Sequence, residues 1–147
     1  MMYLRVVEGV PEGFSLSQLA TENPEVSFPD APSAGLLAEY SVYAFYVPDP
    51  PSFDQLTQQA VQGSFAQDQS GNWYVPWVVE NLPVDQASAN VRAQRDRLLA
   101  ESDWVIIKAT ETGQPVPPEW LAYRQALRDI TKQEGFPYAV VWPVKPV

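Results

Sequence analysis

The sequence predicts an α+β protein, with a small N-terminal β-rich lobe that carries short helices, then a C-terminal two-helix lobe and a terminal extended segment. Prolines interrupt the first half repeatedly, and proline disfavours long helices because it lacks a backbone donor and its ring clashes with the preceding turn. After Pro83, apolar residues recur at helical spacing. The composition also changes near Leu82 and Pro83, so we predict two lobes, residues 1–82 and 83–147.

The first elements of the N-terminal lobe are short. Residues 3–7 are β-branched and aromatic, which is typical of a strand, and turn residues at 9–13 follow. Ser15 and Gln18 have the spacing of a capping box, in which the serine hydroxyl accepts from the amide three residues on and the glutamine reaches back. We therefore expect a two-turn helix from Ser15 to about Glu22.

Three further elements complete this lobe. Residues 33–40 predict a second short helix, and residues 42–47 alternate loosely as a strand does. A hairpin is predicted from residues 60–67 back through residues 73–82, because the segment 68–72 between them reads Asp-Gln-Ser-Gly-Asn and is rich in turn residues.

Helical periodicity dominates the residues after Pro83. Asp85 lies in a first turn, where a carboxylate complements the helix dipole, and apolar residues follow on one side as far as Glu101. Residues 104–107 form a short apolar segment, which leads into a loop at 110–118 that is rich in glycine and proline.

A second long helix is predicted to begin at Pro118, since proline is favoured at the first helical position. Gly135 is expected to supply a left-handed cap after it. Residues 138–142 then return as an extended segment, which either pairs with a strand of the first lobe or caps the two helices. Five apolar residues are expected to form core, and the alternative is that they form a patch that binds a partner protein. They are Trp104, which precedes this helix, and Trp120, Tyr123, Leu127 and Ile130.

The chain has no cysteine and no histidine. This excludes disulfides, thiolate nucleophiles, zinc sites of the cysteine and histidine type, and serine nucleophiles activated by an imidazole. The glycines are scattered and open no phosphate-binding loop. Carboxylate chemistry remains, but no pair among the 18 acidic residues stands out by spacing. We therefore expect no enzymatic activity, no cofactor and no metal site.

The net charge of −9 lies in the first half of the chain. Residues 1–82 hold Arg5 as the one base against ten acids, whereas residues 83–147 hold eight bases and eight acids. An acidic surface repels nucleic-acid phosphates and anionic lipid, so we expect neither nucleic acid nor membrane as a partner. The charge serves solubility or steers the chain towards a basic partner. No apolar run reaches the length of a bilayer span, and we expect synthesis in a cytosol.

The last third of the chain carries a family pattern. In order, it contains Ser102-Asp103-Trp104, Trp120, the run Tyr123-Arg124-Gln125-Ala126-Leu127-Arg128-Asp129-Ile130, Gly135-Phe136-Pro137 and Trp142-Pro143. In these residues the chain resembles the bacteriophage tail assembly chaperone family, proteins encoded beside tail fibre genes. The first lobe is similar to such proteins more loosely.

The resemblance implies a non-enzymatic protein that helps a phage tail fibre or tail protein to fold or trimerise in the host cytoplasm, and that in some members stays on the virion tail. Intertwined β-rich trimers fold slowly and expose strand edges and apolar surface, so a small partner that covers this surface reduces aggregation. The oligomeric state stays open, and the chain either forms a homo-oligomer or binds in a way that matches a trimeric fibre. So do two other functions, a permanent tail or baseplate adaptor subunit and a carboxylate-based hydrolase acting on host surface glycan.

Five residues are candidates for partner binding: Trp73, Trp77, Arg124, Trp142 and Pro143. The three tryptophans fall on the predicted hairpin and on the terminal segment, where aromatic side chains are less surely buried. Arg124 has two possible roles. It either pairs with Asp103 or Asp129 and locks the two helices, or presents its guanidinium to a carboxylate of the partner.

Overall fold

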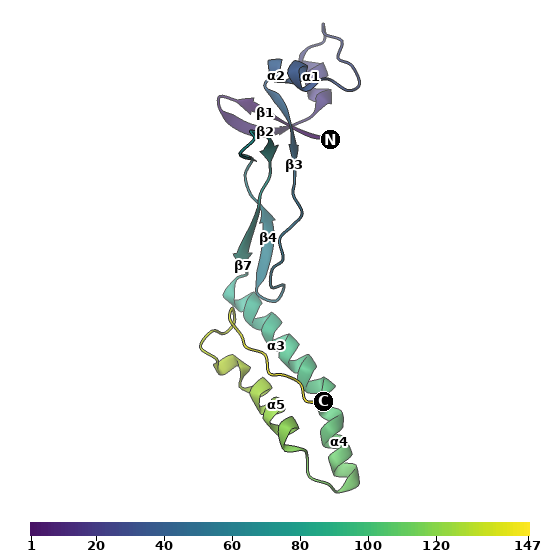
Figure 1. Cartoon of the computed structure of the whole chain (residues 1–147), viewed down its shortest axis with the longest axis vertical. Coiled ribbons are helices and arrows are strands. Elements are labelled where there is room, and N and C mark those ends of the chain that lie inside the picture. Colours follow the sequence, from purple (N-terminus) through teal and green to yellow (C-terminus); the bar gives the residue numbers. More distant parts are fainter. The chain divides into compact units, whose positions relative to one another are not determined.

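The computed structural model describes residues 1–147 and confirms the α+β fold class. Strands dominate the N-terminal part, and the longer helices follow Leu82 (Figure 1). The chain divides into two compact units, which we describe separately. Unit 1 comprises Met1–Pro51 and Ala60–Val78, and unit 2 comprises Ser52–Gln59 and Val79–Val147. The lobe boundary at residues 82 and 83 stays a prediction.

Unit 1 is built on a five-stranded sheet with the strand order β2-β1-β3-β6-β5. Its strands are β1 (Met2–Val7), β2 (Val10–Phe14), β3 (Val42–Tyr46), β5 (Ala66–Gln67) and β6 (Trp73–Tyr74). β3 and β6 pair in parallel, and the other neighbours pair antiparallel. The strands predicted at residues 3–7 and 42–47 are confirmed.

Strand β2 corrects the prediction that residues 9–13 form a turn. The turn is shorter, because Glu8 and Gly9 both have positive φ, 51° and 83°, and Val10 already pairs with Val7. Positive φ at both central residues matches the right-handed twist of the flanking strands. Pro11 is tolerated within β2 because this strand lies at the outer edge of the sheet, where a missing donor breaks no ladder.

Both predicted short helices are confirmed. α1 (Leu16–Glu22) has the predicted capping box: the Gln18 amide donates to the Ser15 hydroxyl at 3.2 Å, and the Ser15 amide donates to the Gln18 side chain at 2.8 Å. α2 (Ala34–Glu39) begins after Ser33, whose hydroxyl caps it in the same way. The helices and the sheet share a buried cluster: Phe14, Leu19, Leu37 and Val42.

The predicted hairpin is confirmed around its turn, since β5 and β6 pair antiparallel on either side of residues 68–72. The pairing is then interrupted at Pro76, which has no amide proton to donate, and continues as a two-stranded sheet of β4 (Gln58–Gln62) and β7 (Trp77–Asn81). The division between the two units passes through both of these strands.

Unit 2 contains three helices, α3 (Val84–Glu101), α4 (Asp103–Thr112) and α5 (Pro118–Arg128), and a 3₁₀ turn at Ile130–Lys132. α5 and the C-terminal segment lie beside α3 (Figure 1). The helices predicted from Asp85 and from Pro118 are confirmed. Four side chains form the buried centre of the unit, with Trp142 packed against them: Val105, Trp120, Tyr123 and Leu127.

Helix α4 is a correction, because the sequence predicts an apolar segment and a loop where it lies, and so two helices in place of three. Its β-branched residues Val105, Ile106 and Ile107 lower helix propensity, and no side chain caps its start. Burial of Val105 and Ala109 provides the stability that local propensity does not.

The predicted left-handed cap at Gly135 is wrong. The glycine that caps a helix in the left-handed conformation is Gly113, with φ 67°, which ends α4. Gly135 serves a close approach instead, because a Cβ there would lie 2.5 Å from the carbonyl oxygen of Ala139. The predicted extended segment at 138–142 is not a strand, and residues 140–147 have no regular secondary structure. No helix combines the length and the apolar character that crossing a bilayer requires.

Candidate partner-binding surfaces

Arg124 is an internal lock, which is one of the two predicted roles. Its side chain reaches from α5 to the junction of α3 and α4, and only 8% of the residue is exposed. The guanidinium donates to the carbonyl oxygen of Leu99 at 2.8 Å, to the hydroxyl of Ser102, and to the carboxylate of Asp103 at 2.8 Å. It therefore stabilises the negative end of α3 and holds the first acidic residue of α4.

The most exposed aromatic surface of unit 2 lies on α4. Trp104 is 52% exposed, although the sequence favours a core position for it, and its ring meets the edge of Trp120 at a centroid distance of 5.7 Å. A groove of about 400 Å³ runs between α4 and the start of α5, lined by Trp104, Trp120, Lys108 and Pro117 among others. Such a groove offers an apolar wall with a cation beside it.

The terminal segment carries the candidates Trp142 and Pro143. Trp142 is half-buried against the centre of unit 2, and Pro143 lines a hollow between the segment and α5. The side-chain amide of Gln133 holds this segment at Val141, accepting from its N–H at 2.8 Å and donating to its carbonyl at 2.9 Å. Trp142 is therefore a packing residue first, while Pro143 stays a partner-binding candidate.

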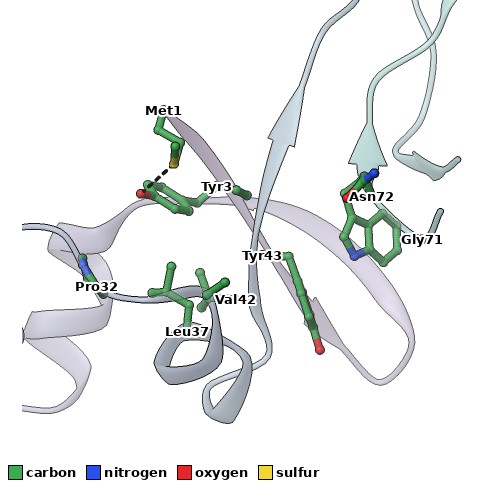
Figure 2. A pocket seen from close by; sticks show the side chains of 11 residues that line it. Met1, Tyr3, Pro32, Leu37, Val42, Tyr43, Gly71 and Asn72 are labelled. Carbon is green, nitrogen blue, oxygen red and sulfur yellow. Dashed lines mark hydrogen bonds between the residues drawn. The ribbon is translucent and has the colours of Figure 1, made fainter.

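The candidate Trp73 lies in unit 1, where it lines a pocket of about 420 Å³. Tyr3 and Leu37 line the same pocket, and so do Val42 and Tyr43 of β3. Figure 2 shows Tyr3, Leu37 and Val42 on one side of the β3 ribbon and Tyr43 on the other. The pocket thus wraps around β3, and Trp73 and Tyr43 form an aromatic wall with a centroid distance of 6.3 Å.

Trp77 is separate from this pocket. Its indole N–H donates to the carbonyl oxygen of Pro48 at 2.8 Å, and the side chain is half-buried. This bond ties the start of β7 to the segment that follows β3, so the structure gives Trp77 a role within unit 1.

Beside the pocket, Asp68 organises the turn between β5 and β6. Its carboxylate accepts from the backbone amide of Ser70 at 2.8 Å, and from the backbone amide and side chain of Asn72 at 2.9 and 3.1 Å. The side-chain hydrogen bond from Asn72, followed by its backbone amide, lowers the pKa of Asp68 from the ordinary 3.8.

Because the folded pKa of Asp68 is depressed, its contribution to stability is complete above the unfolded value and is lost as the pH falls through the folded value. We expect the stability of unit 1 to begin falling near pH 3.8 and to lose the Asp68 contribution at lower pH. An NMR titration of the Asp68 carboxyl carbon, in the folded chain and in urea, measures both values. Asp68→Asn should remove this part of the pH dependence of stability. Equal titration midpoints of Asp68 in the folded and unfolded chain would contradict the lowered pKa.

The C-terminal part of the chain is similar to a known protein family. Residues 88–147 match the model of the family described as phage tail assembly chaperone protein. This segment is similar to the phage tail assembly chaperone family. The resemblance predicted from the sequence is thereby confirmed. No curated protein and no solved structure matches the chain.

The chaperone segment begins inside α3 and contains the Arg124 lock, the exposed face of α4 and the terminal residues Trp142 and Pro143. Trp73, Trp77 and the pocket of unit 1 lie outside it.

Sequence reasoning did not single out Trp104 or Tyr43 as surface aromatics. Trp104 is read as core because α4 is not predicted, and only the course of that helix shows that the ring points partly to solvent. For Tyr43, the alternation within residues 42–47 is a usable signal, since it places Tyr43 on the opposite face from the buried Val42.

Proposed function

We propose that this chain is a non-enzymatic assembly chaperone, which binds a phage tail fibre or another tail protein in the host cytoplasm while that protein folds or trimerises. The family match over residues 88–147 carries the proposal. The exposed apolar side chains of unit 2 support it, because a chaperone of this kind needs apolar surface that a folding client can cover.

The contact surface that we assign to the client is the face of α4 with Trp104 and Ile107, which are 52% and 57% exposed. They are three residues apart, so they are neighbours on one helix face. A large half-exposed aromatic ring beside a groove is the kind of anchor that dominates protein interfaces. The five candidates from the sequence contribute unequally to this proposal, since Arg124 and Trp142 are committed to packing within unit 2.

The absence of catalysis is part of the proposal and rests on the placement of the acids. Among the 18 acidic residues, Asp68 and Asp129 are half-buried and the rest are exposed. Both half-buried carboxylates are bound within the chain, Asp68 by Asn72 and Asp129 by Lys132 and Gln125. A glycoside hydrolase needs two acids facing each other across a cleft, and solvated acids do not favour that chemistry.

Co-expression with a tail fibre protein from the same genome tests the proposed function. We expect the fibre protein to form more soluble trimer with the chain than without it, and the two proteins to co-purify. Equal yields of trimer in both cultures, with no co-purification, would refute the proposal. Mass spectrometry of purified particles adds a second test, because stoichiometric presence of the chain would favour a permanent adaptor subunit.

The Trp104→Ala substitution is expected to reduce the co-purified client at least about tenfold, the effect of removing one interface anchor of 1.4 kcal/mol or more. Val84→Ala is the matched control, since Val84 is similarly exposed, at 55%, at the start of α3. Equal client recovery by the two variants would exclude the α4 face as the contact surface.

A further inference from the structure

The pocket of unit 1 opens at a gap in the sheet. β3 has β1 along one edge, but its pairing with β6 on the other edge begins only at Phe45. The two preceding residues, Tyr43 and Ala44, are exposed and line the pocket. The pocket therefore lies at the point where the pairing of β3 with β6 ends.

Backbone directions place the amide of Ala44 on this edge, where the carbonyl of the same residue accepts the first hydrogen bond from β6. The carbonyl of Ser41 accepts from β1, whereas the carbonyl of Tyr46 accepts from the amide of Val75 on the β6 side. Because these directions alternate along a strand, Ala44 shares the direction of Tyr46. An extended polypeptide laid in the pocket thus meets the amide of Ala44 at the point where the pairing with β6 ends.

The walls of the pocket suit the alternating side chains of an extended segment. Tyr3, Leu37 and Val42 offer an apolar hollow on one face of β3, and Tyr43 lies on the other (Figure 2). The ring of Trp73 lies next to that of Tyr43. A segment along the edge would place successive side chains on these two faces in turn. The aromatic rings also attract cations.

The negative net charge of unit 1 favours an occupant of the pocket that carries positive charge. Unit 1 contains eight acidic residues and one base, Arg5, whose guanidinium is bound to Glu12 and Glu22. Asp30 lies two residues before the pocket residue Pro32, and Glu39 two residues after Leu37. Both are exposed and make no ion pair within the chain, so they add to the negative potential of unit 1.

We propose that this pocket binds an extended segment of the client, in which an aliphatic or aromatic side chain fills the hollow and lysine or arginine lies next to it. The inference rests on the proposed function and adds to it a second contact, outside the chaperone segment, with a defined chemistry. Apolar burial anchors the segment, and the charge difference selects it.

An array of short overlapping peptides, spanning the tail and fibre proteins from the same genome, tests the chemistry directly. We expect the bound peptides to combine an apolar residue with lysine or arginine. Their signal should fall at least fivefold from roughly 0.05 M to 0.5 M salt, because salt screens exposed charges. Binding of acidic peptides, or binding without regard to charge, would overturn the proposal.

Two variants locate the binding. Ala44→Arg fills the pocket from an exposed position, and Asp30→Lys with Glu39→Lys reverses the charge beside it. Each is expected to weaken binding of the best peptide at least tenfold, with the thermal unfolding of the chain unchanged. The matched control is Glu80→Lys with Glu134→Lys, which changes the net charge equally at exposed positions of unit 2 outside α4. If this control weakens binding as much as the pocket variants, the pocket is not the site.

Co-purification of the same variants with the fibre protein separates the two proposals. Reduced recovery with the pocket variants supports the pocket. Unchanged recovery, together with unchanged peptide binding, overturns the pocket while the proposed function stands. If the unmodified chain recovers no tail protein and binds no peptide, both proposals fail.

Discussion

Arg124→Ala is expected to lower the free energy of unfolding by about 2–4 kcal/mol, the loss typical of a buried charged side chain with several hydrogen bonds. The substitution removes three donors at once and leaves the carbonyl of Leu99 with Ser102 as its one remaining side-chain donor. It also removes the aliphatic stem that packs between the helices. Urea unfolding, followed by the helical circular dichroism signal, measures the change.

The matched control is Arg128→Ala, since Arg128 is exposed on the same helix. We expect that change to stay within about 0.5 kcal/mol. Arg124→Lys should recover little of the loss, because an ammonium cannot spread its donors over the three acceptors as a planar guanidinium does. A loss for Arg124→Ala no greater than that for Arg128→Ala would show that the lock contributes nothing to stability.

Leu127→Ala is expected to cost about 2–5 kcal/mol, the range for a fully buried leucine. Leu127 is 0% exposed and belongs to the cluster of Val105, Trp120 and Tyr123 at the centre of unit 2. The large aromatic rings around it cannot collapse readily into the space that the side chain leaves, so a cavity remains. The same urea experiment measures this loss.

Leu121 provides the control for Leu127, because it is a leucine on the same helix with 51% exposure. We expect Leu121→Ala to cost less than about 1 kcal/mol. Leu127→Met, which nearly conserves volume, should cost less than about 1.5 kcal/mol. Similar losses at positions 121 and 127 would contradict the packing of α5 described above.

Sequence reasoning succeeded where a local rule decides the structure. The spacing of Ser15 and Gln18 determines how α1 begins, and Pro118 marks the start of α5. The sequence leaves Asp103 and Asp129 open as partners of Arg124, and the structure shows the pair with Asp103. Sequence reasoning failed for α4, where packing overrides the local helix propensity. It also failed for β2, because a position at the edge of the sheet makes Pro11 acceptable in a strand.

The candidate surfaces were less predictable than the elements. The sequence makes Trp73 a partner-binding candidate on the predicted hairpin, but its neighbour Tyr43 comes from a distant strand, and only the parallel pairing of β3 with β6 brings them together. The gap beside Ala44 is a property of sheet register, which a single sequence does not encode in any short pattern.

The reach of Arg124 constrains how the connection between α4 and α5 can change in length. This loop, residues 113–117, joins the two helices that hold the ends of the Asp103–Arg124 ion pair. An insertion that moved α5 along its axis by one residue would shift the guanidinium by about 1.5 Å and rotate it by about 100°, away from its three acceptors. We therefore expect that in relatives with a longer loop the extra residues bulge outward. The rotation of α5 about its own axis then stays unchanged.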